Sequence, residues 1–441
     1  MEVLVASSST DAGIGCWDLQ TGAELLRYKS CASTPHGLVC VGQRFLASSQ
    51  SHNGIPSSGS VFYWSWSKPQ VEVKSFLAEQ IMTLAANREG TYIVGGGLSG
   101  DIYLWEVASG RLLRKWDGRN RGVSCLVFSN DDSLLISGFE DGWITVWSLL
   151  KILDDYRSQE GSKLYEWSFR EHVERVSDIK SGCGGHNTVI VSAGMDRTCK
   201  IWSLLEGKLL GNIEFETPIE AIALDPGERV FYAGGWNGVI YVARYPKSLS
   251  SKNHGLHIIG SFPNKSKVYC LEYVASRNIL VSGSQDGWVR VWDVRSRKTI
   301  GQFRHGKGGV NNIIVVRQQL YPNPQTSSRR HGSLLPPLEK YANSTNEGTS
   351  TKTVIGFQET YSKSMDAKYL SSHMINNHIE DLQQQGPAAS EMEMDRLELD
   401  CQKARQMVQQ WKKMYEDLHQ YCVNELLEEG TEARGPMRKS A

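Results

Sequence analysis

Six tryptophans end short, alternating apolar stretches at nearly regular intervals, and this spacing constrains the fold more than any other feature of the chain. The double-length interval between Trp202 and Trp292 contains the stretch NGVIYVA, which places Ala243 at an equivalent position. The seven anchor positions are Trp17, Trp64, Trp105, Trp147, Trp202, Ala243 and Trp292, and successive anchors lie 41 to 55 residues apart. A period of roughly 40–45 residues with a Trp-Asp ending is typical of WD40 repeats. The spacing therefore predicts an all-β fold, a seven-bladed WD40 β-propeller.

A second spacing gives the same register. Four repeats carry an Asp six residues before the anchor tryptophan, and each of them also carries a Ser four residues before that Asp. In WD40 proteins these residues, with a His before the innermost strand, form a hydrogen-bonded group, which is stable only when each buried member has a partner. The predicted structural residues are Ser7, Asp11, Trp17 and His305 in the first repeat; Ser137, Asp141 and Trp147 in the fourth; His172, Ser192, Asp196 and Trp202 in the fifth; and Ser282, Asp286 and Trp292 in the seventh.

The first repeat lacks an innermost strand of its own. The stretch MEVLVASS supplies only a second strand, whereas VNNIIVVR, residues 310–317, follows the last repeat and reads as a strand. We predict that 310–317 closes the ring as the innermost strand of blade one, because a closed propeller leaves no long unpaired edge. The propeller then spans residues 1–317. The charged insertion 151–163 within the fourth blade reads as a surface loop or, alternatively, as a dedicated binding element.

The composition changes after residue 317. Residues 318–390 read as a flexible linker, because a segment rich in Ser, Thr, Asn, Gln and Pro cannot bury enough apolar area to offset its ordering entropy. Residues 366–385 within it read as a short helix. The apolar island LLPPL, residues 334–338, is either a docking peptide for a partner or a stretch without a role.

Residues 391–429 have the pattern of a coiled-coil helix. Apolar side chains recur in alternating steps of three and four over about four heptads, as the a and d positions of a coiled coil require. The seam consists of Met394, Leu397, Cys401, Ala404, Val408, Trp411, Tyr415, Leu418 and Cys422. The pattern predicts a homodimer through this helix, and the alternative is that the helix packs against a different partner.

No residue pattern indicates an enzyme. The Gly-rich stretch VGGGLSG, residues 94–100, lies in a predicted β-hairpin, so the helix N-terminus that a phosphate-binding loop requires is absent. The 11 His residues lack H-x-H and H-E-x-x-H spacing and the nine Cys lack C-x-x-C spacing, so no catalytic residue, metal site or cofactor is predicted. Scattered cysteines also favour a reducing compartment, the cytosol or the nucleus.

Charge and hydropathy give no support to two further classes of partner, nucleic acid and membrane. The 48 basic and 48 acidic residues cancel, so no overall field draws the chain onto nucleic acid, and no direct nucleic-acid site is evident. No stretch approaches the ~20 apolar residues that a membrane-spanning helix needs, and a membrane partner is therefore not expected.

The residue before each repeated Asp position is expected on an exposed turn at one end of the propeller, where such folds bind partners. These residues are Thr10, Ser57, Leu98, Glu140, Met195, Trp236 and Gln285. The candidate partner face is Glu140, Met195, Trp236 and Gln285, with Trp236 as its main contact residue. Alternatively, Trp236 caps its own blade.

Several stretches resemble the WD-repeat-containing protein 18 family, whose fungal counterpart is the propeller subunit of the Rix complex. They are LWEVASGRLL, VSCLVFSNDDSLLISG, VSDIKSGCGGHNTVIVSAGMDRTCKIWSLLEGKLL and ILVSGSQDGWVRVWDVRS. The resemblance covers residues 1 to about 317 and the C-terminal helix.

This resemblance implies a non-enzymatic scaffold for pre-rRNA processing and large ribosomal subunit maturation in the nucleus, nucleolus and nucleoplasm. Its implied partners are an α-solenoid subunit and a helical subunit, with a midasin-type ATPase and the pre-ribosome as indirect partners. The resemblance also implies dimerisation through the terminal helix. The alternative is a generic WD40 adaptor such as a ubiquitin-ligase substrate receptor, for which the stretch Trp292-Asp293-Val294-Arg295 is the single matching motif.

Overall fold

The computed structural model describes residues 1–10, 12–51, 59–154, 163–185, 188–244, 257–306, 308–317 and 335–341. Asp11, Ser57, most of the predicted linker, the predicted helices 366–385 and 391–429 and the seam from Met394 to Cys422 lie outside the described residues.

Within the described residues, the strands form seven four-stranded antiparallel sheets, and each sheet is one blade. From the innermost strand outward, blade 1 consists of β28 (Val310–Arg317), β1 (Glu2–Ser8), β2 (Ile14–Asp18) and β3 (Glu24–Tyr28); blade 2 of β4 (Ser33–Val41), β5 (Phe45–Gln50), β6 (Ser60–Ser65) and β7 (Val73–Phe76); and blade 3 of β8 (Ile81–Ala86), β9 (Tyr92–Gly97), β10 (Asp101–Glu106) and β11 (Leu112–Asp117). Blade 4 consists of β12 (Val123–Phe128), β13 (Leu134–Phe139), β14 (Ile144–Ser148) and β15 (Tyr165–Phe169); and blade 5 of β16 (Val176–Ser181), β17 (Val189–Gly194), β18 (Thr198–Ser203) and β19 (Lys208–Glu214). Blade 6 consists of β20 (Ile219–Leu224), β21 (Val230–Gly235), β22 (Val239–Arg244) and β23 (His257–Pro263); and blade 7 of β24 (Val268–Val274), β25 (Ile279–Ser284), β26 (Trp288–Asp293) and β27 (Thr299–Arg304). The predicted seven-bladed propeller is confirmed.

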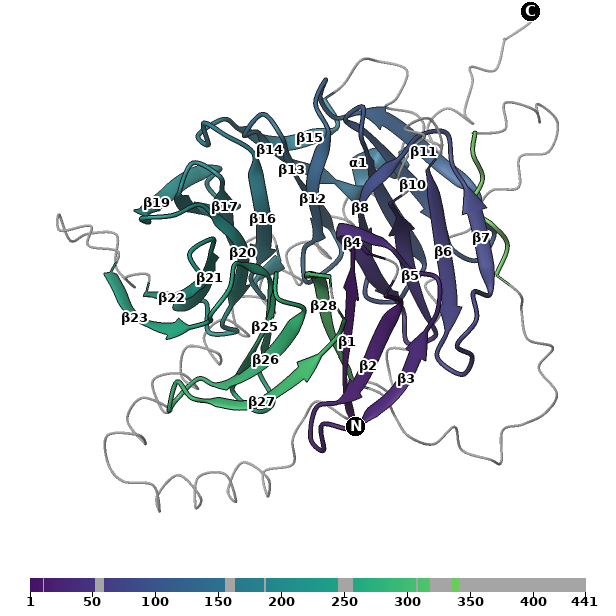
Figure 1. Cartoon of the computed structure of the whole chain (residues 1–441). Helices are drawn as coiled ribbons and strands as arrows, with labels where there is room; N and C mark the ends of the chain where they lie inside the picture. Colours follow the sequence, from purple (N-terminus) through teal and green to yellow (C-terminus); the bar gives the residue numbers. More distant parts are fainter. Residues whose placement is uncertain are drawn as a thin grey trace, which may run out of the picture. The chain divides into compact units, whose positions relative to one another are not determined.

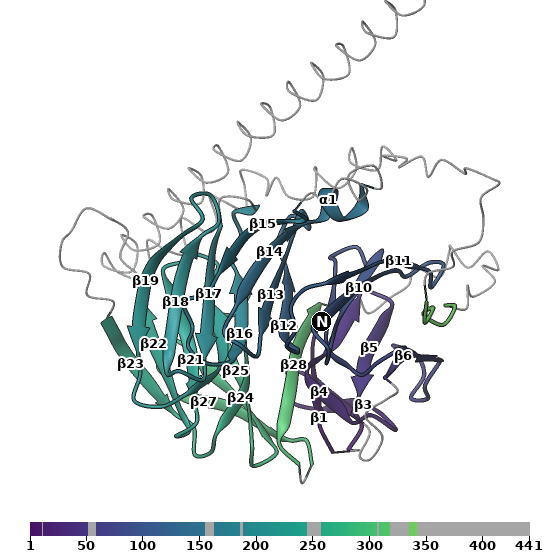
Figure 2. The same ribbon diagram turned by 90° about the horizontal axis from the view of Figure 1, so that it is seen from above.

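The innermost strands form a closed ring. Each contacts the next in the order β4, β8, β12, β16, β20, β24 and β28, and β28 contacts β4 (Figures 1 and 2). Figure 1 shows β28 beside β1, and the pairing runs from Glu2 opposite Arg317 to Ser7 opposite Asn312. Blade 1 is therefore built from both ends of the described propeller sequence, and the closing strand has the bounds that the spacing predicted.

The anchor positions share one place in their sheets. Each lies on the third strand and pairs with a large apolar residue on the second strand. The pairs are Trp17 with Leu4, Trp64 with Leu46, Trp105 with Ile93, Trp147 with Leu135, Trp202 with Ile190, Ala243 with Phe231, and Trp292 with Leu280. Among the described residues, the buried apolar side chains form seven clusters, each drawn from two neighbouring blades. Burial between blades holds the ring together, because each blade covers its two faces by packing against its two neighbours.

Two segments differ from the sequence expectations. The first three residues of the insertion in blade 4 belong to the short helix α1 (Leu149–Leu153), and Ile152 of this helix is buried in the cluster between blades 3 and 4. Within the expected linker, residues 335–341 lie on the propeller, and Leu338 is buried in the cluster between blades 2 and 3. The composition of 318–390 does not predict an ordered segment, because the apolar residues of 335–341 pack against propeller residues that are distant in the sequence. No helix in the described part of the chain is long and apolar enough to cross a membrane.

Candidate interaction surface and central channel

Blade 5 contains a complete hydrogen-bonded group. Nε2 of His172 lies 2.8 Å from Oγ of Ser192, and the same hydroxyl accepts a hydrogen bond from Nε1 of Trp202 at 3.0 Å. Nδ1 of His172 lies 3.0 Å from the Asp196 carboxylate. Burial raises the pKa of this carboxyl, but hydrogen bonds from His172, Thr198 and a backbone amide outweigh burial and lower the pKa to about 2. The group links three parts of the blade: the turn before β18, which carries Asp196, the second strand β17, which carries Ser192, and β18 itself, which carries Trp202.

Blades 4 and 7 contain only part of this group. Nε1 of Trp147 donates to Oγ of Ser137 at 2.8 Å, and Nε1 of Trp292 donates to Oγ of Ser282 at 2.9 Å. In blade 4 the Asp141 carboxylate accepts the backbone N–H of Trp143 at 3.4 Å. The turn before β14 is thus held through its own backbone.

In blade 7 an arginine replaces the histidine. Asp286 forms an ion pair of 2.5 Å with Arg290 of β26 and accepts a 2.6 Å hydrogen bond from Ser284. Burial raises the pKa of the Asp286 carboxyl, whereas the hydrogen bonds from Arg290 and Ser284 lower it and prevail. The sequence spacing located Asp286 but did not identify Arg290, because an Arg on an alternating strand reads as an ordinary exposed residue.

In blade 1 the predicted group is not assembled among the described residues. Oγ of Ser7 accepts a 3.1 Å hydrogen bond from the Asn312 side chain, and neither ring nitrogen of His305 has a hydrogen-bond partner in the described part of the chain. His305 contacts Trp17 edge-on, with 5.9 Å between the ring centroids. Burial, together with the smaller effect of the nearby Arg27 charge, lowers the pKa of His305 to about 4. The expected Ser–His contact fails because the closing strand brings Asn312 directly opposite Ser7.

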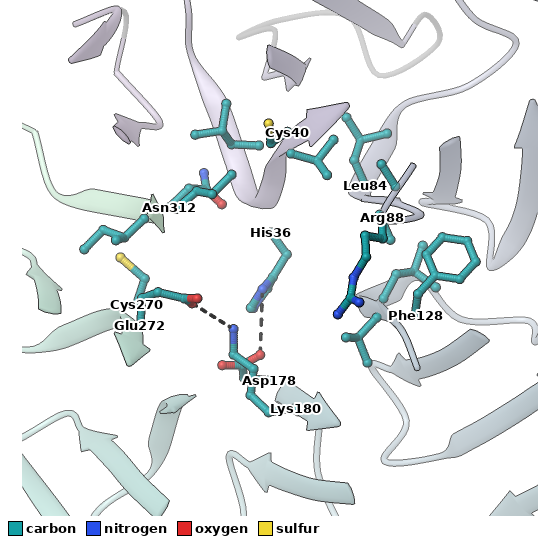
Figure 3. Close-up of a pocket in the computed structure, with 18 of the residues that line it drawn as sticks. His36, Cys40, Leu84, Arg88, Phe128, Asp178, Lys180, Cys270, Glu272 and Asn312 are labelled. Carbon is teal, nitrogen blue, oxygen red and sulfur yellow. Dashed lines mark hydrogen bonds and ion pairs between the residues drawn. The ribbon is translucent and has the colours of Figure 1, made fainter. Parts of the chain in front are cut away.

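A loop within β4 crosses the central channel, a feature that the repeat spacing does not predict. The pairing of β4 with β5 is interrupted between Ser33 and Leu38, and His36 adopts a positive φ of 55° there. Nε2 of His36 lies 2.9 Å from the carbonyl oxygen of Ser177 on β16. Figure 3 shows His36 in the middle of the cavity, directed toward Asp178. The crossing loop therefore links blade 2 to blade 5 through the centre of the ring.

The channel contains a cavity of about 480 Å³ with both apolar and charged lining. Lys180 lies 3.5 Å from the Glu272 carboxylate, and Asp178 accepts the backbone N–H of Ile222 at 2.8 Å. Burial lowers the pKa of Lys180, but Glu272 and Asp178 raise it by more, so the net shift is upward. A lysine whose pKa is raised stays protonated at neutral pH and is a poor nucleophile or base. The described residues contain no group of three or more His, Cys, Asp or Glu side chains placed to hold a metal ion.

The predicted partner face lies on turns that share one backbone contact. In five blades the turn residue donates its N–H to a carbonyl just before the innermost strand of the same blade, at 2.9 to 3.1 Å. These residues are Leu98, Glu140, Met195, Trp236 and Gln285. Leu98, Glu140, Trp236 and Gln285 are exposed, and Met195 is half-buried. We call this set of turn residues the rim.

Trp236 is the large aromatic side chain of the rim, and it is held in place while 44% exposed. Its Nε1 donates a 2.7 Å hydrogen bond to Glu220 of its own blade. Lys267, which precedes blade 7, places its ammonium 3.5 Å from the centre of the Trp236 ring and 3.1 Å from the Glu220 carboxylate. Both readings of Trp236 therefore find support in the geometry: it braces its blade, and it presents an ordered aromatic face to solvent.

The ring of seven blades, the anchor register and the exposed rim define a WD40 propeller protein. The family described as WD domain, G-beta repeat matches residues 110–148, 163–203 and 256–293. The chain belongs to the WD repeat-containing protein 18 family: it is 31% identical to WD repeat-containing protein 18 of Bos taurus over 77% of this chain and 78% of that protein.

Two further relatives extend this comparison. The chain is 50% identical to Protein ROOT INITIATION DEFECTIVE 3 of Arabidopsis thaliana, over 96% of this chain and 98% of that protein. It is 27% identical to Pre-rRNA-processing protein IPI3 of Yarrowia lipolytica, over 72% of this chain and 76% of that protein. The crystal structure of the computationally designed Ika8 protein has a similar fold, with a TM-score of 0.51 and 23% identity over 70% of this chain and 85% of that chain.

Proposed function

We propose that this chain is a non-enzymatic scaffold subunit of a nuclear complex that processes pre-rRNA and matures the large ribosomal subunit. The observation that carries the proposal is the family relationship, which includes a fungal relative named for pre-rRNA processing and covers most of both chains. The relative with 50% identity covers nearly the whole length, so the proposal concerns the complete chain and not the propeller alone.

The chemistry of the described residues supports a scaffold rather than a catalyst. The charged side chains of the channel are paired with each other or with backbone groups, and the loop carrying His36 crosses the channel. A catalytic acid or base needs a pKa near the working pH and access to a substrate. The raised pKa of Lys180 does not meet the first requirement.

Four residues of the rim form the proposed partner face: Glu140, Met195, Trp236 and Gln285. Trp236 is ordered before binding by Glu220 and Lys267, so little side-chain entropy is lost when a partner covers its exposed ring. Tryptophans in such positions contribute strongly to protein interfaces. The proposed partners are an α-solenoid subunit and a helical subunit of a Rix-like complex, and through them a midasin-type ATPase and the pre-ribosome. The proposed location is the nucleus, including nucleolus and nucleoplasm.

Affinity purification of the tagged chain with mass spectrometry tests this proposal. We expect large-subunit assembly proteins in the eluate, and we expect depletion of the chain to cause accumulation of pre-rRNA that retains internal transcribed spacer sequence. The alternative, a ubiquitin-ligase receptor, predicts a cullin adaptor in the eluate that disappears in an Arg295→Ala variant. That result, without any pre-ribosomal protein in the wild-type eluate, would replace the scaffold proposal.

The seam of residues 391–429 is proposed to make the chain a homodimer. Charges at d positions would lie in the apolar interface, where an unpaired charge costs several kcal/mol. We expect Leu397→Glu with Leu418→Glu to convert a dimer into a monomer in light scattering, whereas the control Gln402→Glu with Gln409→Glu, at outward positions, should remain dimeric. A wild-type chain that is monomeric at micromolar concentration would contradict the homodimer.

A further inference from the structure

Residues 335–341, which we call the strap, occupy a defined site on the outer part of blades 2 and 3. We call this the strap site; it consists of Ser75 of β7, Trp105 of β10, Gly110 of the following turn, and Leu112 of β11. We propose that the strap site is a peptide-binding site that recognises the sequence Leu-Pro-Pro-Leu-Glu, and that the chain fills it with its own residues.

Blade 3 leaves the indole N–H of its anchor Trp105 without an acceptor on the blade's own second strand. In blades 4, 5 and 7 the anchor tryptophan donates to a serine on the second strand. Blade 3 has Gly95 at that position, and a Cβ there would lie 2.9 Å from the six-membered ring of Trp105. The glycine thus accommodates the far edge of the indole, and Nε1 of Trp105 donates instead to the carbonyl oxygen of Glu339 at 2.9 Å.

The strap makes several specific backbone and side-chain contacts over two consecutive residues. The N–H of Leu338 donates to Oγ of Ser75 at 2.9 Å, and the N–H of Glu339 donates to the carbonyl oxygen of Gly110 at 2.8 Å. The Glu339 carboxylate accepts the N–H of Leu112 at 3.3 Å. Two consecutive amides, one carbonyl and one carboxylate of the strap are therefore bound, which is the pattern of a recognised ligand and not of incidental packing.

Apolar burial and backbone conformation also favour binding of the strap at this site. Leu338 is 4% exposed and packs with Trp105, Leu112 and Val73, and Leu335 packs against the same cluster. The two intervening prolines fix φ and favour an extended backbone, which lowers the entropy lost on docking. Gly110 has a positive φ of 69°, and a Cβ on it would lie 2.4 Å from the carbonyl oxygen of Pro337. The site therefore requires a glycine where the peptide backbone approaches most closely.

The first test measures amide hydrogen exchange in the full-length chain. We expect slow exchange at Leu338, Glu339 and Leu112 in the wild type, and loss of protection in a Leu338→Asp variant. Tyr341→Asp is the matched control, because Tyr341 lies in the same segment and is 66% exposed. Exchange at Leu338 and Glu339 in the wild type as fast as in an unstructured peptide would overturn the proposal, and this measurement does not depend on how well any variant folds.

The second test asks whether the site recognises the sequence when it is supplied separately. A fluorescent peptide of residues 333–343 should bind the full-length Leu338→Asp chain, whose site is vacated, and bind the wild type at least about tenfold more weakly, because the tethered strap competes at high effective concentration. The same peptide carrying Leu338→Asp should bind neither chain. Equal binding of the unmodified peptide to both chains, or to neither, would contradict a specific peptide site.

Discussion

At the residue scale, the hydrogen-bonded group of blade 5 shows how buried polar atoms stabilise a propeller blade. Oγ of Ser192 lies between Nε2 of His172 and Nε1 of Trp202, so one hydroxyl serves two buried nitrogens. Asp196 fixes the other side of the imidazole and accepts further hydrogen bonds from its own turn. Removing the hydroxyl leaves both buried nitrogens without their partner, which costs more than the bonds contributed.

Because the loss grows with the number of buried nitrogens left without a partner, two serines at equivalent positions should contribute differently to the free energy of unfolding. Ser192→Ala should lower the free energy of unfolding by about 2–4 kcal/mol, because two buried donors or acceptors lose a partner. Ser137→Ala, the matched control in blade 4, should cost about 1–2 kcal/mol, since the Ser137 hydroxyl serves one buried nitrogen, Nε1 of Trp147, and itself donates to the carbonyl oxygen of Thr145 at 3.3 Å. Urea unfolding of both variants measures the difference, and equal losses would show that His172 adds nothing to the group.

A second residue-scale prediction concerns acid stability. The folded chain holds His305 with a pKa of about 4, against an ordinary value of 6.5. Because the pKa of His305 is lower in the folded chain, the unfolded chain takes up the proton first as the pH falls. The contribution of neutral His305 to the free energy of unfolding is therefore complete above pH 6.5 and is lost as the pH falls from 6.5 to 4. The loss amounts to about 3 kcal/mol.

We therefore expect His305→Asn to flatten the pH dependence of the unfolding free energy between pH 6.5 and 4, whatever the absolute stability of the variant. Asp196→Asn serves as the comparison. The pKa of Asp196 is lowered from 3.8 to about 2, so its contribution is complete above pH 3.8 and is lost below it. An unchanged slope between pH 6.5 and 4 in His305→Asn would contradict the neutral, buried histidine.

At the element scale, the repeated strands could be predicted and the contacts between distant segments could not. The Trp and Asp spacings locate the second and third strands of most blades because each strand keeps the same register with its neighbour. The loop of His36 left only a weak signal, the Pro and Gly that interrupt β4, and its target on β16 is 141 residues away. The strap has no counterpart in the repeats, so from the sequence its seven residues are indistinguishable from a linker. The structure shows that they supply the acceptor for the indole N–H of Trp105.

Chains ending at three different residues test the roles of β28 and the strap. A chain ending at residue 305 should fail to fold, because it lacks the strand that pairs with β1 and separates β24 from β4. A chain ending at residue 341 should melt at the temperature of the full-length propeller. A chain ending at residue 317 should fold but be less stable by about 3 kcal/mol, from the lost burial of Leu338 and the lost acceptor of Trp105. A cooperative transition in the shortest chain would refute closure by β28.

At the scale of the whole molecule, the propeller is a ring whose neighbouring blades are joined by packed apolar interfaces. Among the described residues, seven apolar clusters join neighbouring blades, and the His36 loop adds a link between blades 2 and 5 across the channel. A ring tied together in this way cannot change shape locally without disturbing packed interfaces. Partner recognition is therefore expected to depend on side chains already ordered on the rim, of which Trp236 exposes the largest aromatic surface.

Two rim residues at the same turn position, Trp236 and Leu98, should respond differently to substitution by alanine. Trp236→Ala should reduce the recovery of co-purifying large-subunit assembly proteins by about tenfold or more, because a hot-spot tryptophan is worth at least ~2 kcal/mol in an interface. Leu98→Ala is the control, since Leu98 is similarly exposed, at 42% against 44%, but has neither the ring nor the Glu220 and Lys267 support. Both variants should retain the wild-type melting temperature within a few degrees, so that lost binding cannot be attributed to unfolding. If Trp236→Ala melts well below Leu98→Ala and keeps all its partners, the tryptophan serves only to brace blade 6, and the contact surface lies elsewhere on the ring.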